Sequence, residues 1–358
     1  MKSNFEFLDK YWPALAQIGA AAESYVYSDP NACLYKLGMF GERLILEIFA
    51  FEHIKEPTID NTHANRIRLL KREGLIPKKI DDILYALRKT RNDAVHAGAD
   101  SVEDAKTLLS MTYNLAVWFM EVYGDWGYIA PAFVMPENVV QPDYESIIKE
   151  QEEKIVALSK QVEAVSTAAS TKTSKERAEK GETASESMEL SEAETRYLID
   201  EQLRKFGWEA DTNTLRYSKG TRPQKGRNLA IAEWPTDSAV GKNGYADYAL
   251  FVGVKLVGIV EAKKAAIDIP SVIDHQCKEY AKGIKAEHKD YVIGQWGAYK
   301  VPFVFATNGR KYLKQIETKS GIWYLDLRSG ANAPKALQGW ISPQGLLEQL
   351  EKNIAAAN

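Results

Sequence analysis

The chain has 358 residues, more than one ordinary domain holds, so two or three domains are expected. Its hydrophobic content of 45% and its charged content of 27% are typical of a globular protein. The net charge of −3 excludes a globally basic protein, so any contact with nucleic acid must come from a local patch.

Cysteine content and hydrophobicity predict the compartment. The two cysteines, Cys33 and Cys277, lie far apart and outside any metal-ligand spacing, which argues for a reduced compartment without disulfides. The first residues, MKSNFEFLDKYW, lack the apolar core of a secretory signal. No stretch approaches the ~18 apolar residues of a membrane span. The sequence therefore predicts a cytoplasmic protein with no membrane partner.

Residues 1–130 are expected to form an all-helical domain. The stretches CLYKLGMFGERLILEIFAFEHI and SVEDAKTLLSMTYNLAVWFMEVYG place apolar residues three and four apart, the spacing of helices that bury one face. Ser101 opens the second stretch with an S-x-x-D capping pattern, and Gly124 is expected to end it.

Residues 131–190 are expected to connect two domains. Three prolines within 131–142 indicate a break in regular structure. The next segment, STAASTKTSKERAEKGETASESMELSEAE, has almost no large apolar residue and predicts a flexible linker at about 166–190. Between these two segments, heptad spacing predicts a short coiled-coil-like helix with an apolar seam of Ile148, Ile155, Leu158, Val162 and Val165.

Residues 191–358 are expected to form an α/β domain with a mixed sheet. SEAETRYLIDEQLRKFGW predicts a helix, with Ser191 and Glu194 in capping-box spacing. The runs DYALFV and LVGIV, separated by Gly253-Val254-Lys255, predict a hairpin. PSVIDHQCKEYAKGI predicts another helix, and VPFVFATNG and GIWYLDL predict further strands, so helices and strands alternate.

Charged residues stand where this hairpin should be buried. Asp247 lies at the start of its first strand, and Glu261 and Lys263 close its second. Because side chains alternate across a strand, Val257, Ile259, Glu261 and Lys263 are expected on one face. Folding back the hairpin should bring the two carboxylates and the amine together at one end of the sheet.

This grouping suits a hard divalent cation. Mg²⁺ prefers oxygen ligands, and an ion between Asp247 and Glu261 would remove the repulsion of two nearby acids. Metal-bound water can attack phosphorus, and Lys263 could hold or deprotonate that water or stabilise the charge that develops. The alternative interpretation is that all three are solvated charges at the ends of strands.

The D-x13-E-x-K pattern on a predicted hairpin after a helix resembles the PD-(D/E)xK nuclease core. SEAETRYLIDEQLRKFGWEAD, GYADYALFVGVKLVGIVEAKK, QCKEY and VFATNG are similar to the nuclease domain of the type I restriction enzyme R subunit, over about 190–330. The resemblance implies a Mg²⁺-dependent DNA endonuclease, in which Mn²⁺ can substitute. Asp247 and Glu261 would be its metal ligands and Lys263 its catalytic lysine.

The same resemblance extends to three other residues. Gln276 and Tyr280 match the family's Q-x-x-x-Y motif, which supports cleavage, and their spacing places both on one helical face. Glu194 matches the acidic residue on the first helix of many such nucleases. Ala246 stands where the superfamily name has proline, a residue without a chemical role.

The resemblance also implies partners and a motor. The substrate would be double-stranded DNA, and the methyltransferase and specificity subunits of a type I restriction complex would supply target recognition. The family normally continues into an ATP-driven helicase motor. This sequence has no GxxxxGK[ST] motif and stops at LLEQLEKNIAAAN, about where a motor would begin. ATP is therefore expected to act only through a motor domain absent from this chain.

An acid-free segment, RYSKGTRPQKGR, precedes the hairpin. It either grips DNA phosphates or is a solvated loop, and the residues leave both interpretations open. Its five basic residues are Arg216, Lys219, Arg222, Lys225 and Arg227.

In the helical half, RNDAVH resembles the R-x4-H signature of HEPN-type domains. The region 30–125 looks like the related DUF4145-type domain that is fused ahead of restriction subunits. In active members, this arginine and histidine cleave RNA across a dimer, which would make Arg91 and His96 an RNase site. Alternatively, they tie the helix end to a neighbouring turn, or the region mediates assembly. Three functions thus remain: a DNA endonuclease, a non-catalytic docking module, and an RNase.

Overall fold

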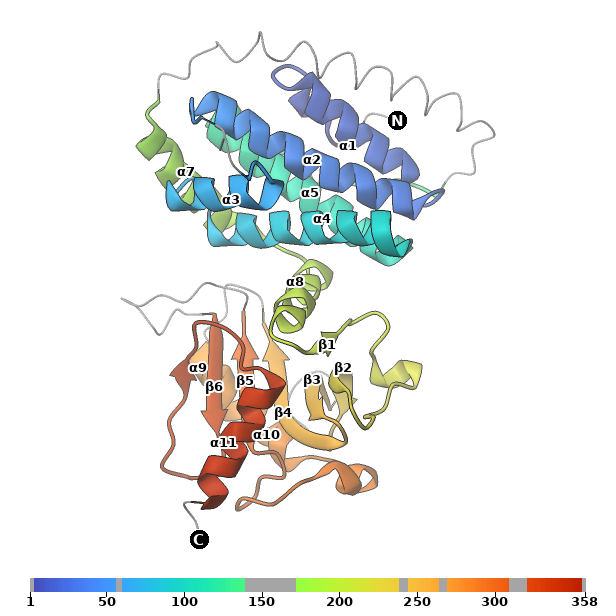
Figure 1. Ribbon diagram of the computed structural model, residues 1–358, viewed down its shortest axis with the longest axis vertical. Helices are drawn as coiled ribbons and strands as arrows, with labels where there is room; N and C mark the ends of the chain where they lie inside the picture. Colours follow the sequence, from blue (N-terminus) through green and yellow to red (C-terminus); the bar gives the residue numbers. More distant parts are fainter. Residues whose placement is uncertain are drawn as a thin grey trace. The chain divides into compact units, whose positions relative to one another are not determined.

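The computed structural model describes residues 3–55, 60–138, 172–237, 244–263, 269–308 and 321–355. The chain divides into two compact units, Met1–Leu190 and Ser191–Asn358 (Figure 1). None of the helices in the described ranges is long and apolar enough to cross a membrane.

The first unit is all-helical, as the sequence predicts. Its long central helix, α2, packs against α1, α4 and α5. Helix starts follow local chemistry, since Asp29 accepts a hydrogen bond from Ala32 N at 2.9 Å, and Ser101 accepts one from Asp104 N at 3.1 Å. The helices are α1 (Pro13–Tyr25), α2 (Pro30–Phe51), α3 (His63–Arg72), α4 (Lys78–Ala97), α5 (Val102–Phe119) and α7 (Ser174–Ser187), with a 3-10 turn at Glu6–Leu8 and a π turn at Met120–Gly124.

Helix α7 corrects the prediction of a flexible linker at 166–190. Residues 174–187 are helical, and polar contacts dock them onto the other helices of the first unit in place of the missing large apolar side chains. Arg177 makes two 2.7 Å hydrogen bonds to the Glu52 carboxylate, and Trp118 Nε1 donates to Gly181 O at 3.0 Å. The predicted heptad helix lies within 139–171, outside the described residues.

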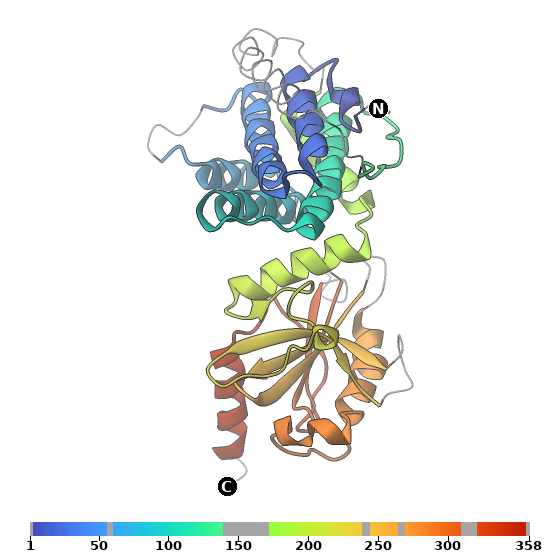
Figure 2. The same ribbon diagram turned by 90° about the vertical axis from the view of Figure 1, so that its right-hand side faces the viewer.

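The second unit is a mixed seven-stranded sheet between helices, which confirms the predicted α/β class (Figure 2). The strands follow chain order: β1 (Glu209–Ala210), β2 (Asn228–Pro235), β3 (Tyr245–Val252), β4 (Lys255–Ala262), β5 (Phe303–Thr307), β6 (Ile322–Asp326) and β7 (Lys335–Ala336). The pairs β1–β2 and β4–β5 are parallel, and the other neighbouring pairs are antiparallel.

Helices bury both faces of this sheet. Helices α8 (Glu192–Lys205) and α11 (Pro343–Ala355) pack on one face. On the other face lies a continuous helical stretch made of α9 (Ile269–Val272), a π turn (Ile273–Cys277) and α10 (Lys278–Lys282). Short 3-10 turns at Tyr217–Lys219 and Ala286–Tyr291 complete the unit.

The β3–β4 hairpin contains a bulge that the sequence did not predict. Val252 pairs with Lys255 around a two-residue turn, in which Gly253 has a φ of 61°. The register then shifts between Leu250 and Phe251. Val257 packs towards α8 and α11, whereas Ile259 packs towards α9 and α10. The expectation that Val257 shares a face with Ile259 is therefore wrong, because the bulge resets the alternation.

Candidate metal and nuclease site

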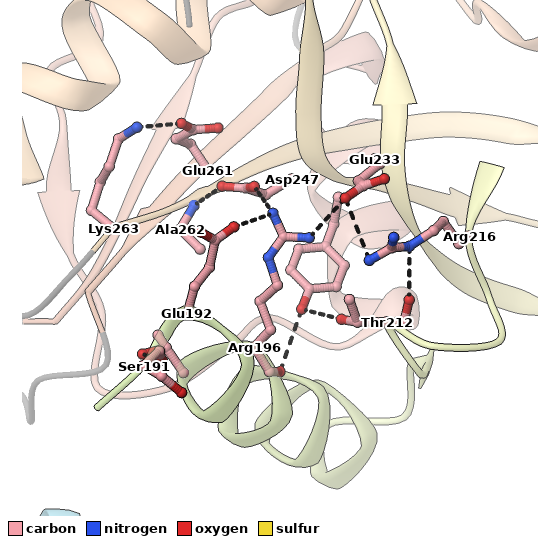
Figure 3. A network of polar contacts seen from close by, with 12 residues as sticks. Ser191, Glu192, Arg196, Thr212, Arg216, Glu233, Asp247, Glu261, Ala262 and Lys263 are labelled. Atoms are coloured by element: carbon pink, nitrogen blue, oxygen red, sulfur yellow. Dashed lines mark hydrogen bonds and ion pairs between the residues drawn. The ribbon is translucent and has the colours of Figure 1, made fainter. Parts of the chain in front are cut away.

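The hairpin brings Asp247, Glu261 and Lys263 together (Figure 3). Asp247 Oδ2 accepts a hydrogen bond from the Ala262 backbone N at 2.7 Å, which joins the beginning of β3 to the end of β4. Lys263 Nζ donates to Glu261 Oε1 at 2.5 Å, and Lys263 N donates to Thr307 O of β5 at 2.7 Å. The grouping at the sheet end is therefore held by contacts with β3 on one side of β4 and with β5 on the other.

Glu261 is the most perturbed acid of the group. Its residue is 4% exposed, and this burial, followed by the nearby charge of Asp247, raises its pKa to about 8. Lys263 opposes the rise only in part. Burial and the charge of Asp247 both disfavour the charged form of Glu261, and a bound cation would favour it.

The donor set fits a divalent cation. Glu261 Oε2 is buried and has no hydrogen-bond partner, and a cation would satisfy it. The described residues contain no group of three or more His, Cys, Asp or Glu side chains that could hold a metal ion. An ion held by Asp247 and Glu261 would therefore take its other ligands from backbone, water or substrate, as Mg²⁺ commonly does.

A residue that the sequence analysis missed, Arg196 of α8, also contacts the acids. Its Nη2 lies 2.8 Å from Asp247 Oδ1 and 3.2 Å from Glu192 Oε1, and its Nη1 lies 3.4 Å from Glu233 Oε1. Glu233 Oε1 is also 3.4 Å from Arg216 Nη2. No motif marks Arg196, and the only signal was its place on a helix predicted to precede the hairpin.

Glu194, the expected first-helix acid, caps α8. Its Oε2 accepts a hydrogen bond from Ser191 N at 2.7 Å, and Ser191 Oγ accepts one from Glu194 N at 3.2 Å. This is the capping box that the sequence predicts. The α8 side chain that bonds to Asp247 is that of Arg196.

The Q-x-x-x-Y pair lies on the helical stretch that covers the opposite face from α8. Tyr280 is 1% exposed, and its pKa is raised by burial first and then by the charges of Glu261 and Asp247. The Tyr280 hydroxyl therefore lies within the electrostatic influence of the acids. Gln276 is half-buried in the π turn, a feature frequent at functional sites. Its role stays a prediction.

Comparisons of this sequence with known proteins identify its family. The model "Type I restriction enzyme EcoKI endonuclease subunit second domain" matches residues 209–350, and "Domain of unknown function (DUF4145)" matches residues 20–163. The type I restriction enzyme EcoKI endonuclease subunit of Escherichia coli (strain K12) is 33% identical over 423 residues, covering 98% of this chain. This chain belongs to the type I restriction endonuclease subunits. It spans 36% of that relative's length, and no solved structure matches it.

In this type I subunit chain, three of the five predicted DNA-binding residues have internal partners. Arg216 pairs with Glu233, and Arg227 lies 2.6 Å from Glu209. Arg222 stacks on the Tyr217 ring at 3.6 Å. The remaining two, Lys219 and Lys225, are exposed.

The predicted RNase residues of the type I subunit, Arg91 and His96, both lie on α4. Arg91 of α4 forms an ion pair with Glu42 of α2 and lies over the Tyr35 ring at 5.2 Å. His96 is exposed in the last turn of α4. The helix end is tied by Asn31, whose amide donates to the carbonyls of residues 94 and 99. An RNase site shared between two chains stays a prediction from the sequence.

Proposed function

We propose that the second unit is the Mg²⁺-dependent nuclease module of a type I restriction enzyme, which hydrolyses phosphodiester bonds in double-stranded DNA. The observation that carries this proposal is the buried, unpartnered Glu261 Oε2 beside Asp247. The name of the curated relative, an endonuclease subunit, supports the same chemistry. Mn²⁺ is expected to substitute for Mg²⁺ because both accept oxygen ligands.

The chain's own side chains divide the work. Asp247 and Glu261 would hold the ion, which, when bound, would lower the pKa of a water molecule and neutralise phosphate charge. The Lys263 ammonium, 2.5 Å from Glu261 Oε1, would move from that carboxylate towards the scissile phosphate and stabilise its developing negative charge. Tyr280 is buried in the core on the α9–α10 face of the sheet and would help to exclude water from that side.

Residues outside the acidic site would bind the DNA and the partner subunits. Lys219 and Lys225 are the strongest candidates for phosphate contacts, because they are exposed and the three arginines are engaged internally. Sequence recognition would lie in the specificity and methyltransferase subunits, with the helical unit as a docking surface. ATP would act only through a motor domain.

The direct test is E261Q in the full chain. We expect the substitution to abolish Mg²⁺-dependent nicking of plasmid DNA and to weaken Mn²⁺ binding, because it removes the charge of one ligand. E279Q is the matched control: Glu279 lies on α10, pairs with Lys282, and should be dispensable. Circular dichroism of both variants verifies that the fold persists.

Other outcomes separate the alternative functions. Equal nicking by E261Q and the unsubstituted chain would refute the proposal. An unsubstituted chain that neither binds Mn²⁺ nor nicks DNA would favour a non-catalytic docking module. Metal-independent RNA cleavage that is lost in H96A would favour the RNase.

A further inference from the structure

We infer that Arg196 is a positioning residue of the candidate metal site, holding the Asp247 carboxylate in the orientation that receives a cation together with Glu261. This inference rests on the proposed nuclease function and deepens it. It concerns a residue of α8 that lies outside the D-x13-E-x-K pattern, and its support is geometric.

Both oxygens of Asp247 have donors from different elements. Arg196 Nη2 donates to Oδ1 at 2.8 Å, and Ala262 N donates to Oδ2 at 2.7 Å. Rotation of the carboxylate would break at least one of these bonds. Each carboxylate oxygen has more than one lone-pair site, so an oxygen that accepts a hydrogen bond can still coordinate an ion. The two donors therefore orient Asp247 without blocking it.

Helix α8 is attached to the sheet without Arg196. One turn further along, Asp200 accepts a hydrogen bond from Thr212 N at 2.7 Å, and the Thr212 hydroxyl lies 2.8 Å from the hydroxyl of Tyr248 in β3. Ile199 is fully buried against the same face of the sheet. These contacts already hold α8 on the sheet. The Arg196 guanidinium is therefore not needed to attach the helix and can orient the Asp247 carboxylate.

Glu233 supplies a further counter-charge to Arg196, besides Asp247 and Glu192. It lies opposite Asp247 in the β2–β3 register, between the pairs Ala232–Tyr248 and Trp234–Ala246. Its φ is 52°, an unusual and strained conformation for a residue with a side chain.

The Oε1 atom of Glu233 lies 3.4 Å from Arg196 Nη1. When a cation draws on the charge of Asp247, Glu233 and Glu192 remain as partners for the guanidinium. Arg196 is only 13% exposed on its side chain, so losing every counter-charge would be costly. The pair formed by Arg196 and Glu233 thus keeps Asp247 aligned in both the free and the ion-bound protein.

The experiment is Mn²⁺ titration of the full chain by calorimetry, without nucleic acid. We expect R196Q to bind Mn²⁺ about 10–100-fold more weakly, the usual effect of removing a residue that orients a metal ligand. R196K should lose less affinity, because lysine keeps the charge but cannot reproduce the planar fork that bonds Asp247 and Glu233 together.

R204Q is the matched control, on the same helix. Arg204 is also partly buried and pairs with Glu201, away from the acids, so its loss should leave Mn²⁺ affinity unchanged. Unchanged affinity in a folded R196Q would overturn the inference, and if R196Q does not fold, unchanged affinity in R196K would do so. If the unsubstituted chain binds no Mn²⁺, the proposed function and this inference both fail. If it binds Mn²⁺ and the Arg196 variants bind it equally well, only this inference fails.

Discussion

At the residue scale, Glu261 is set apart by its environment. It is a carboxylate buried next to a second carboxylate, and its lysine partner offsets only part of that cost. The sequence predicted the meeting of Asp247, Glu261 and Lys263 from their spacing, since a tight reversal at residues 253–255 should fold the strand ends back together. Burial and the missing partner of Glu261 Oε2 depend on the packing around the hairpin, and no pattern predicts them.

The raised pKa of Glu261 predicts a pH dependence for the metal-free chain. The folded state binds this proton with a pKa of about 8, against 4.5 for an ordinary glutamate, so it binds protons more tightly than the unfolded state. The contribution to the free energy of unfolding is therefore full below pH 4.5 and is lost as the pH rises through about 8.

We expect E261Q to remove this decline. Urea unfolding in EDTA between about pH 5 and pH 9 measures it, and E279Q should keep the slope of the unsubstituted chain. An E261Q variant whose stability still falls as steeply would show that another group titrates in this range.

At the scale of elements, amino-acid composition failed to predict a helix that is held in place by polar contacts. Helix α7 was missed because it has few large apolar residues, yet buried Arg177 and Glu52 hold it. Strand β2 was not predicted either, although NLAIAEWP is buried along most of its length. The predicted hairpin strands and the strands after it were confirmed, and the helix predicted over 270–284 spans 269–282 with a π turn within it. Their apolar runs are bounded by clear turn residues.

Helix α7 gives a stability prediction. R177M leaves the Glu52 carboxylate, whose side chain is 2% exposed, without its counter-charge. We expect a loss of about 3–5 kcal/mol in the free energy of unfolding, measured by urea denaturation. K175M, an exposed position on the same helix, is the control and should change little. A small effect of R177M would mean that α7 is only loosely docked.

The basic segment gives a binding prediction. Replacing Lys219 and Lys225 with glutamine should weaken duplex binding for all sequences alike, and should reduce the salt slope of log K by about 0.9 for each lost phosphate contact. R227Q is the comparison, because Arg227 is paired with Glu209. A salt slope unchanged in the double lysine variant would identify the segment as a solvated loop.

At the scale of the whole molecule, the two units carry separate candidate chemistries. The candidate nuclease residues belong entirely to the second unit, and Arg91 and His96 belong to the first. The chain's net charge of −3 is compatible with DNA binding only through local groups such as Lys219 and Lys225. The two family models match one region in each unit, which supports treating them as distinct modules.

The sequence by itself determined the helical first half, the α/β second half and the meeting of Asp247, Glu261 and Lys263. These features follow from local periodicity and from one short turn, which neighbouring residues specify. Only the tertiary structure decided three features. A bulge places Val257 on the opposite face of β4 from Ile259, and α7 packs on the other helices of the first unit. Arg196 forms ion pairs with both Asp247 and Glu233. Those features depend on charges and backbone geometry that folding brings together from separate elements. Residues that meet in this way have no regular spacing in the sequence, so no sequence pattern predicts their contacts.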